Sequence, residues 1–165
     1  MKKFVALLLA VLMVASLCAC GQKDTGSDLQ TVTKGKLIMS TNAEFAPYEY
    51  VADDGKGFQG TGYEGIDIEI AYALAQKLGL ELVVDDMDFD AALLAVQQNK
   101  SDIVMAGVTV TEDRQLVMNF SDSYATGVQV VIVKEGSDVT LDNLGEKMIG
   151  TQRGTTGCLL YTSPS

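Results

Sequence analysis

The chain of 165 residues contains no histidine. Histidine is the commonest general base near neutral pH and the commonest side chain that binds zinc. Its absence excludes serine, cysteine and zinc chemistry that depends on an imidazole, and we expect neither a metal nor a cofactor.

Basic residues are also scarce. Twelve Lys and Arg stand against 22 Asp and Glu, which gives a net charge of -10. Nucleic-acid phosphates would be repelled, so no nucleic-acid partner is expected. A small ligand is not excluded, because a single Arg can dominate a local pocket. The 47% hydrophobic and 21% charged residues are typical of a globular chain.

The first 19 residues predict a secretory signal. Lys2 and Lys3 precede an apolar run, 4–17, that is short for a membrane span. The run ends in Leu17-Cys18-Ala19-Cys20-Gly21, which resembles a bacterial lipoprotein box with Cys20 as the lipidated residue. Cys18 fits less well, because bulky Leu17 would then directly precede the cleavage site. An uncleaved membrane anchor is the alternative, and both predict an exported, tethered domain.

The three cysteines and one polar segment are the other features of the N-terminal region. Cys18 would leave with the signal and Cys20 would carry lipid, so the three cysteines do not predict a disulfide framework. Residues 20–34 are mostly polar and lack an apolar period, which predicts a flexible tether.

The body alternates strands and helices. Apolar runs predict strands at 36–40, 81–84 and 102–105, and periodic segments predict helices at 65–78 and 88–99. We assign the row Ile66, Ile70, Leu74 and Leu78, flanked by Ala71 and Ala75, to the inner face of the first helix, and Phe89, Leu93 and Val96 to that of the second. This order predicts a parallel sheet with right-handed crossovers. A hairpin between 48–51 and 57–60 should turn at Asp54-Gly55.

The segment Ala106 to Arg114 follows the third strand and carries the candidate site. Ligands of open α/β sheets sit where strands end. Thr111 is a candidate N-cap, Glu112 and Asp113 suit a first helical turn, and the dipole there favours an anion. Arg114 could hold a carboxylate through two hydrogen bonds. The alternative is an ordinary surface Arg on a capped helix.

Several segments are informative when taken together: Gly65-Ile66-Asp67-Ile68-Glu69-Ile70, Phe45-Ala46-Pro47, the helix at 90–99, Thr109 to Arg114, Phe120-Ser121-Asp122 and Gly154-Thr155-Thr156. Together they resemble the family 3 extracellular solute-binding proteins, the amino-acid receptors of ABC importers. The similarity runs from about Gly35 to Gly157.

The resemblance implies an α/β fold like the type II periplasmic binding proteins, with two lobes built on parallel sheets. Lobe 1 would span 35–125, a hinge strand 126–134, and the start of lobe 2 135–157. We expect a helical turn at 142–145, a strand at 148–151 and the beginning of a helix at 154–157. Residues 158–165 lack helical period and resemble translated sequencing adapter. We therefore expect a non-native tail, a nearly complete lobe 1 and a truncated lobe 2; a natural short C-terminus is the alternative.

The resemblance also implies site residues. Arg114 matches the Arg that clamps the ligand α-carboxylate, and Thr109 matches a hydroxyl contact, with the backbone of Ala106 and Gly107 alongside. Phe45 matches the aromatic residue that packs on the ligand side chain; taken without the resemblance, a side chain that only fills the core is the alternative. Asn42 stands where some relatives carry an acid for a basic side chain, which argues against a strictly Lys or Arg ligand. Thr155 and Thr156 match the lobe-two backbone that closes on the carboxylate.

The expected function is therefore an extracytoplasmic amino-acid receptor that delivers its ligand, expected to be polar, to an ABC importer permease. It would be lipid-anchored at the outer face of the cytoplasmic membrane. With lobe 2 truncated, we expect weak binding or none. Two alternatives are a dehydratase-like enzyme on the same fold and the sensing module of a membrane receptor. An enzyme would need an acid or base in the cleft, and only Glu112 and Asp113 lie near Arg114 in sequence.

Overall fold

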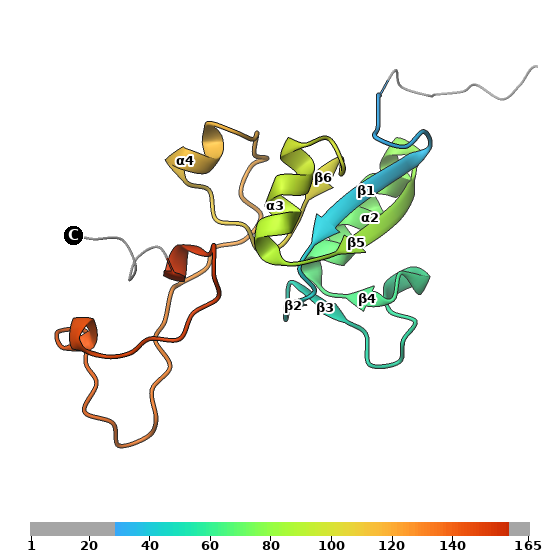
Figure 1. The fold of residues 1–165 in the computed structure, drawn as a ribbon. Helices are drawn as coiled ribbons and strands as arrows, with labels where there is room; N and C mark the ends of the chain where they lie inside the picture. Colours follow the sequence, from blue (N-terminus) through green and yellow to red (C-terminus); the bar gives the residue numbers. More distant parts are fainter. Residues whose placement is uncertain (1–28, 159–165) are drawn as a thin grey trace, which may run out of the picture.

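A parallel sheet forms the centre of the molecule. The structure is a computed structural model, and it describes residues 29–158. Its three parallel strands are β1 (Lys36–Thr41), β5 (Glu81–Asp86) and β6 (Ile103–Val104). They pair in the order β5-β1-β6, so the first strand lies in the middle (Figure 1). The predicted parallel sheet is confirmed.

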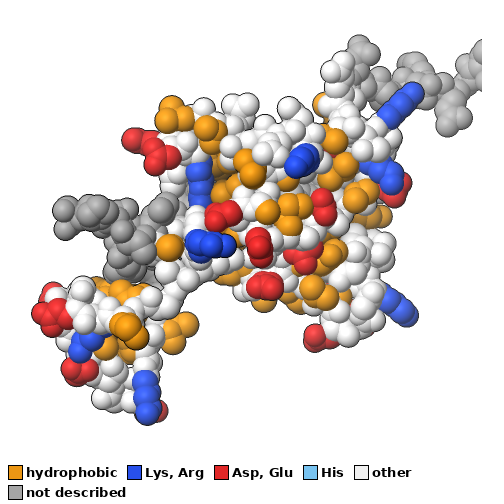
Figure 2. Space-filling view, in the orientation of Figure 1, with side chains coloured by type: hydrophobic (Ala, Val, Ile, Leu, Met, Phe, Trp, Pro, Cys, Tyr) orange, Lys and Arg blue, Asp and Glu red, His pale blue; other side chains and the backbone are white. Residues whose placement is uncertain are grey.

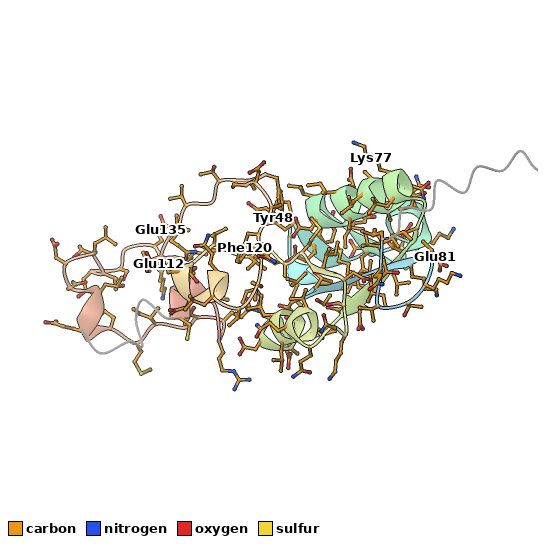
Figure 3. The ribbon with its side chains drawn as sticks, turned by 90° about the horizontal axis from the view of Figure 1, so that it is seen from above. Tyr48, Lys77, Glu81, Glu112, Phe120 and Glu135 are labelled. Carbon is orange, nitrogen blue, oxygen red and sulfur yellow. The ribbon has the colours of Figure 1, made fainter. Side chains whose placement is uncertain are left out.

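Two helices cover opposite faces of this sheet. They are α2 (Ile66–Leu78) and α3 (Phe89–Gln97). Seen from above, α2 lies on one side of the strands and α3 on the other (Figure 3). This is the arrangement expected when the chain first moves from β1 to β5 and then crosses back over β1 to β6. Both helices stand where the sequence predicts them, and Gly79 ends α2 in the left-handed conformation.

The buried face of α2 differs from the prediction. Ile68, Ala71 and Ala75 are fully buried, whereas Ile66 and Ile70 are 43% and 38% exposed. Leu74 is 37% exposed. The large side chains at i, i+4 therefore lie toward solvent, and the small alanines allow the helix to approach the sheet closely. The assignment of the row Ile66, Ile70 and Leu74 to the inner face is wrong.

The core has two parts. Met39, Ile68 and Ala71 pack between β1 and α2, and Phe89, Leu93 and Ala106 pack beneath α3. Phe89 and Leu93 are buried as predicted, but Val96 is only half-buried and Ala92 takes its place in the core.

A small antiparallel sheet flanks the main one. Its strands are β2 (Glu44–Phe45), β3 (Glu49–Val51) and β4 (Tyr63–Glu64), in the order β2-β3-β4. The second half of the predicted hairpin is therefore at 63–64, and residues 58–60 form the 3-10 turn η2 (Phe58–Gly60). The hairpin loop is longer than predicted because the intervening glycines extend it.

The C-terminal segment departs most from expectation. Within the described part of the chain, residues 126–134 and 148–151 contain no strand, so the two predicted strands are wrong. A β-branched run forms a strand only when another strand pairs with it, and Val130 and Ile132 are instead 74% and 93% exposed. The predicted turn at 142–145 is η3 (Leu144–Glu146), and residues 156–158 are helical at the edge of the described region.

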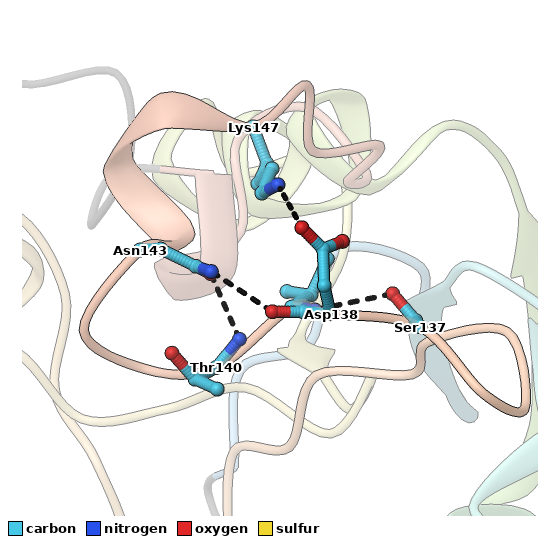
Figure 4. Close-up of polar contacts among 6 residues, drawn as sticks. Ser137, Asp138, Thr140, Asn143 and Lys147 are labelled. Atoms are coloured by element: carbon cyan, nitrogen blue, oxygen red, sulfur yellow. Dashed lines mark hydrogen bonds and ion pairs between the residues drawn. The ribbon is translucent and has the colours of Figure 1, made fainter.

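Local polar contacts hold the loop before η3. Asn143 Nδ2 donates to the carbonyl of Asp138 at 2.9 Å, and its Oδ1 accepts from the N–H of Thr140 at 2.8 Å (Figure 4). Lys147 forms an ion pair with Asp138 at 3.2 Å. Short-range bonds of this kind fix a loop without a sheet.

Acidic and hydrophobic groups are interspersed on the face seen in Figure 2, and that face shows no continuous basic patch. Among residues 29–158, no helix is long and apolar enough to cross a membrane. The predicted signal and lipid box lie within residues 1–28, outside the described residues, and all of the predicted tail 158–165 except Cys158 also lies outside them.

Candidate ligand-binding site

The strand ends bring the predicted site residues to one edge of the sheet. β1 runs into Asn42 and β6 into Ala106, and the two strands are parallel neighbours. The N–H of Met87, after β5, donates to Thr41 O at 3.0 Å. Tyr48 lies at this end of the body, whereas Glu81 lies at the other (Figure 3). The predicted convergence at the carboxyl ends of the strands is therefore observed.

Phe45 forms an aromatic wall at this edge. Its ring is 49% exposed and stacks on Tyr48, with ring centroids 5.3 Å apart. Its other neighbour is Gly107, where an added Cβ would lie 2.7 Å from Cε1 of Phe45. Gly107 has a φ of +53°, so glycine suits this position for both conformation and space. Phe45 and Gly107 were among the site residues predicted from the sequence, whereas Tyr48 was not.

Arg114 lies between two backbone carbonyls. Its Nη1 donates to Thr109 O at 2.8 Å, and its Nη2 donates to Gly154 O at 3.0 Å. Its guanidinium carbon stands 5.5 Å from the centre of the Phe89 ring. Each terminal nitrogen of a guanidinium carries a second N–H. The side chain is thus fixed in place and retains donors for a ligand.

The charge of Arg114 is not neutralised by a direct ion pair. In the region that the structure describes, the ion pairs are Lys36–Glu81, Lys147–Asp138 and Arg153–Asp90. Burial lowers the pKa of Arg114 from its ordinary value, and the charge of Asp90 opposes this shift. Arginine starts from so high a pKa that it stays charged near neutral pH. A half-buried cation without a carboxylate partner is suited to an anionic ligand.

The helix that carries Arg114 is shorter than the predicted anion site requires. α4 (Glu112–Gln115) is one turn, and Thr111 Oγ1 accepts from the N–H of Arg114 at 3.3 Å. The predicted N-cap is confirmed. Few peptide dipoles are aligned in a single turn, so the expected support from a helix dipole is small. The guanidinium itself remains the main source of positive charge.

Residues 152–154 contact three parts of the body at this end of the sheet: the residue after β1, helix α3 and helix α4. Gln152 Nε2 donates to Asn42 Oδ1 at 2.7 Å, Arg153 Nε lies 3.9 Å from Asp90 Oδ2, and Gly154 O accepts from Arg114. We call these residues the clasp. A Cβ at Gly154 would overlap the carboxylate of Asp90, so the clasp sits tightly against α3.

The other predicted residues have defined partners of their own. Asn42 is 8% exposed and also donates to Met87 O at 3.1 Å, so its amide is engaged on both sides. The side chain of Ala106 is buried, and Thr109 is exposed. Thr155 Oγ1 donates to Gln152 O at 2.7 Å, and Thr156 Oγ1 accepts from Gln129 at 3.4 Å. The structure therefore gathers Asn42, Phe45, Gly107, Thr109 and Arg114, with Thr155 and Thr156 next to the clasp.

A buried acidic cluster behind the site was missed from the sequence. Glu49 and Asp67 are both 0% exposed. Burial is the largest cause that raises the pKa of Glu49 from 4.5 to about 10, and the neighbouring carboxyl group of Asp67 raises it further. Burial is also the main cause that raises the pKa of Tyr124, ahead of its bond to Asp67. Alternation in a three-residue strand gave no signal that Glu49 would face inward.

A hollow of about 680 Å³ lies elsewhere, among residues 129–157. Neither Arg114 nor Phe45 lines it. Its walls are the segments that form no strand, with Val130 and Met148 widely exposed. We do not assign it to the ligand, because it lies apart from the site residues predicted at the strand ends.

Comparison with known proteins gives a family. The sequence profile of "Bacterial extracellular solute-binding proteins, family 3" matches residues 37–157. The chain is 37% identical over 156 residues to the arginine-binding extracellular protein ArtP of Bacillus subtilis. It is 36% identical over 160 residues to a probable histidine-binding protein of Neisseria gonorrhoeae. These matches cover 94% and 95% of this chain and 57% of each relative, so the chain spans a little over half the length of both.

Solved structures give the same result for the fold. A mutant of ArgBP from T. maritima matches with a TM-score of 0.70 at 34% identity, over 78% of this chain and 55% of that one. The arginine-bound form of domain 1 from TmArgBP matches with a TM-score of 0.50 at 36% identity, over 55% and 67%. The predicted α/β fold of the periplasmic binding proteins is confirmed.

Proposed function

The chain belongs to the bacterial extracellular solute-binding proteins, family 3, and we propose that it is an amino-acid receptor of an ABC importer. The observation that carries this proposal is Arg114, which is charged, half-buried, fixed by two carbonyls and free of a carboxylate partner among the described residues. A guanidinium so placed binds a carboxylate through parallel hydrogen bonds. Every amino acid supplies that group.

The ligand side chain lies against Phe45 in this proposal. The exposed ring stands beside Gly107 at the same strand edge as Arg114, so one small molecule could contact both. An aromatic face attracts a cation as well as an apolar group. The relatives named for arginine and histidine support a ligand with a cationic or polar side chain.

The remaining predicted residues take lesser roles. Thr109 is exposed and offers its hydroxyl, and the backbone of Ala106 lies beside it. We propose that Asn42 holds the site together without contacting the ligand, because its amide is already bonded to Met87 and Gln152. Thr155 and Thr156 would present backbone groups next to the clasp. No catalytic activity is proposed, since binding needs no acid or base at the site.

Closure between two lobes is the proposed basis of capture, with lobe 1 at 35–125 and residues 126–134 leading to lobe 2. Contacts added only in the closed form would shift the equilibrium toward closure. The sequence led us to expect weak binding or none. The arginine-bound domain 1 from TmArgBP favours measurable binding by lobe-1 residues alone.

We further propose that the receptor is exported and anchored by lipid on Cys20, and that a permease of the importer receives its ligand. The charged start, the short apolar run and the lipoprotein box support the anchor. Mass spectrometry of the protein expressed in a bacterium should find lipid on wild type and on Cys18→Ser, but not on Cys20→Ser. An unlipidated wild type would contradict the anchor.

The receptor function is tested by calorimetry of the chain with a panel of the common amino acids. Binding of arginine, or of another polar amino acid, is expected, with no binding of the corresponding amine that lacks the carboxylate. Equal binding of the amine would remove the proposed role of Arg114.

A further inference from the structure

Two acids from different elements meet behind the aromatic wall. Glu49 lies on β3 and Asp67 in the first turn of α2, and both are fully buried. The two elements are joined here, because the N–H of Asp67 donates to the carbonyl of Tyr48, the residue before Glu49, at 2.9 Å. Asp67 has a donor for each oxygen: its Oδ1 accepts from the hydroxyl of Tyr124 at 2.7 Å, and its Oδ2 accepts from the N–H of Gly107 at 3.1 Å. Neither oxygen of Glu49 has a hydrogen-bond partner among residues 29–158.

This asymmetry determines where a proton is held. Two ionised carboxylates cannot donate to each other, and burying both charges together is strongly unfavourable. A protonated Glu49 can donate its hydroxyl to Asp67, which satisfies the group that otherwise has no partner. Asp67 is the acceptor of the pair because its oxygens already receive an N–H and an O–H.

We propose that Glu49 and Asp67 share one proton, and that the protonated pair acts as a positioning device for the ligand-binding loop through the bond from Gly107 to Asp67. The ligand part of this inference rests on the proposed receptor function, whereas the proton and the loop position do not.

The bond to Gly107 transmits the state of the pair to the site. Gly107 packs against Phe45, and Thr109, two residues later, accepts from Arg114. A shift of the Gly107 N–H away from Asp67 would therefore move the aromatic wall and one support of the guanidinium together. Tyr124 ties the segment after α4 to the same carboxylate.

Loss of the proton from Glu49 would place two negative charges side by side in a buried space. The pKa of Glu49, raised to about 10 chiefly by burial, puts this event well above neutral pH. The other titratable groups facing Glu49 are Asp67 on α2 and Tyr124 on the segment after α4. Burial raises the pKa of Tyr124 above the ordinary value for tyrosine, so Tyr124 keeps its proton while Glu49 titrates.

Infrared spectroscopy of the ligand-free chain tests the proton. At about pH 8, far above the ordinary pKa of 4.5 for Glu, wild type should show the carbonyl band of a protonated carboxylic acid. The band should vanish in Glu49→Gln and remain in the control Glu44→Gln, whose side chain is exposed on β2. A spectrum without that band, or one unchanged by Glu49→Gln, would overturn the shared proton.

Carbon-detected NMR of the ligand-free chain tests the positioning. The backbone nitrogen resonance of Gly107 should titrate with an apparent pKa near 10 in wild type and in Glu44→Gln. It should stay unchanged over the same range in Glu49→Gln. A merely structural role for Glu49 predicts no titration at Gly107 in wild type, and that result would overturn the positioning role.

Arginine affinity extends the test to the ligand. The affinity of wild type relative to Glu49→Gln should fall about fourfold between about pH 8 and about pH 10.5, because the protonated fraction falls by that factor. The titration of the arginine α-ammonium is common to both proteins and cancels in the ratio. A flat ratio with measurable binding would contradict the proposal. If no arginine binds at any pH, the receptor proposal fails. The infrared and NMR results still test whether Glu49 and Asp67 share a proton and whether that proton positions Gly107.

Discussion

The guanidinium of Arg114 donates through Nη2 to the carbonyl of Gly154 at 3.0 Å, although the two residues lie 40 positions apart. Gly154 directly precedes Thr155 and Thr156, which we associate with the second half of the site. One side chain therefore joins the loop after β6 to the clasp. The bond orients the guanidinium before any ligand arrives, which reduces the side-chain entropy lost on binding.

Replacing Gly107 by Ala should weaken ligand binding. The new methyl group would lie 2.7 Å from the Phe45 ring, so the ring must move. Gly55→Ala is a matched control, because Gly55 also has a positive φ, of +67°, but nothing lies within 4 Å of its Cβ position. Both variants should lose stability because alanine is strained at a positive φ, by about 1 kcal/mol in Gly55→Ala and by more in Gly107→Ala, where the ring must also move. Calorimetry should find lower arginine affinity for Gly107→Ala alone; equal affinities would contradict the aromatic wall.

Ile68→Ala should destabilise the chain far more than Ile70→Ala. Ile68 is fully buried beside Met39, whereas Ile70 is 38% exposed on the same helix. The buried deletion should cost about 2–5 kcal/mol and the exposed one less than about 1 kcal/mol. Urea unfolding measures both. A larger loss for Ile70→Ala would show that the row containing Ile70 faces the sheet, as the sequence predicted.

Helix α2 shows that periodicity in the sequence can predict a helix without predicting which side chains it buries. A spacing of 3.6 residues predicted the helix itself, and Gly79 predicted its end. The choice of face was only partly right because large apolar side chains lie on both sides: the flanking Ala71 and Ala75 are buried, whereas the row itself lies toward solvent. The ligand contacts of Arg114 and Phe45 remain predictions, but the positions of both residues at strand ends were predictable because each follows a recognisable strand. Tyr48, Asp67 and Tyr124 were not, since their roles depend on contacts between segments distant in sequence.

Asn42→Asp should destabilise the chain without improving arginine binding. The Asn42 amide donates to Met87 O at 3.1 Å, and a carboxylate has no proton to replace that bond. Two acceptors would then face each other, at a cost of about 1–3 kcal/mol. The control Asn119→Asp makes the same change at an exposed position. Thermal unfolding compares their stabilities. A gain in arginine affinity for Asn42→Asp would show that this side chain faces the ligand.

Glu49→Gln should change how stability depends on pH. Between pH 4.5 and about 10, the folded wild type holds a proton that the unfolded chain has lost, so its free energy of unfolding falls as pH rises. The slope contributed by one proton is at most about 1.4 kcal/mol per pH unit. The variant lacks this contribution, and below pH 4.5 the two slopes should coincide.

Urea unfolding across this range should therefore find that the stability of Glu49→Gln relative to wild type increases with pH. The control Glu44→Gln should follow wild type throughout. Parallel curves for Glu49→Gln and wild type would show that the buried acid does not hold the proton.

The most direct measurement is calorimetry of arginine with the wild-type chain, with Arg114→Lys and with Arg153→Lys. Lysine keeps the charge but loses the planar pair of donors, so Arg114→Lys should bind at least about tenfold more weakly, or about 1.4 kcal/mol. Arg153 lies on the clasp with a widely exposed side chain, and Arg153→Lys should bind like wild type. Wild-type affinity in Arg114→Lys would contradict the claim that Arg114 holds the ligand carboxylate.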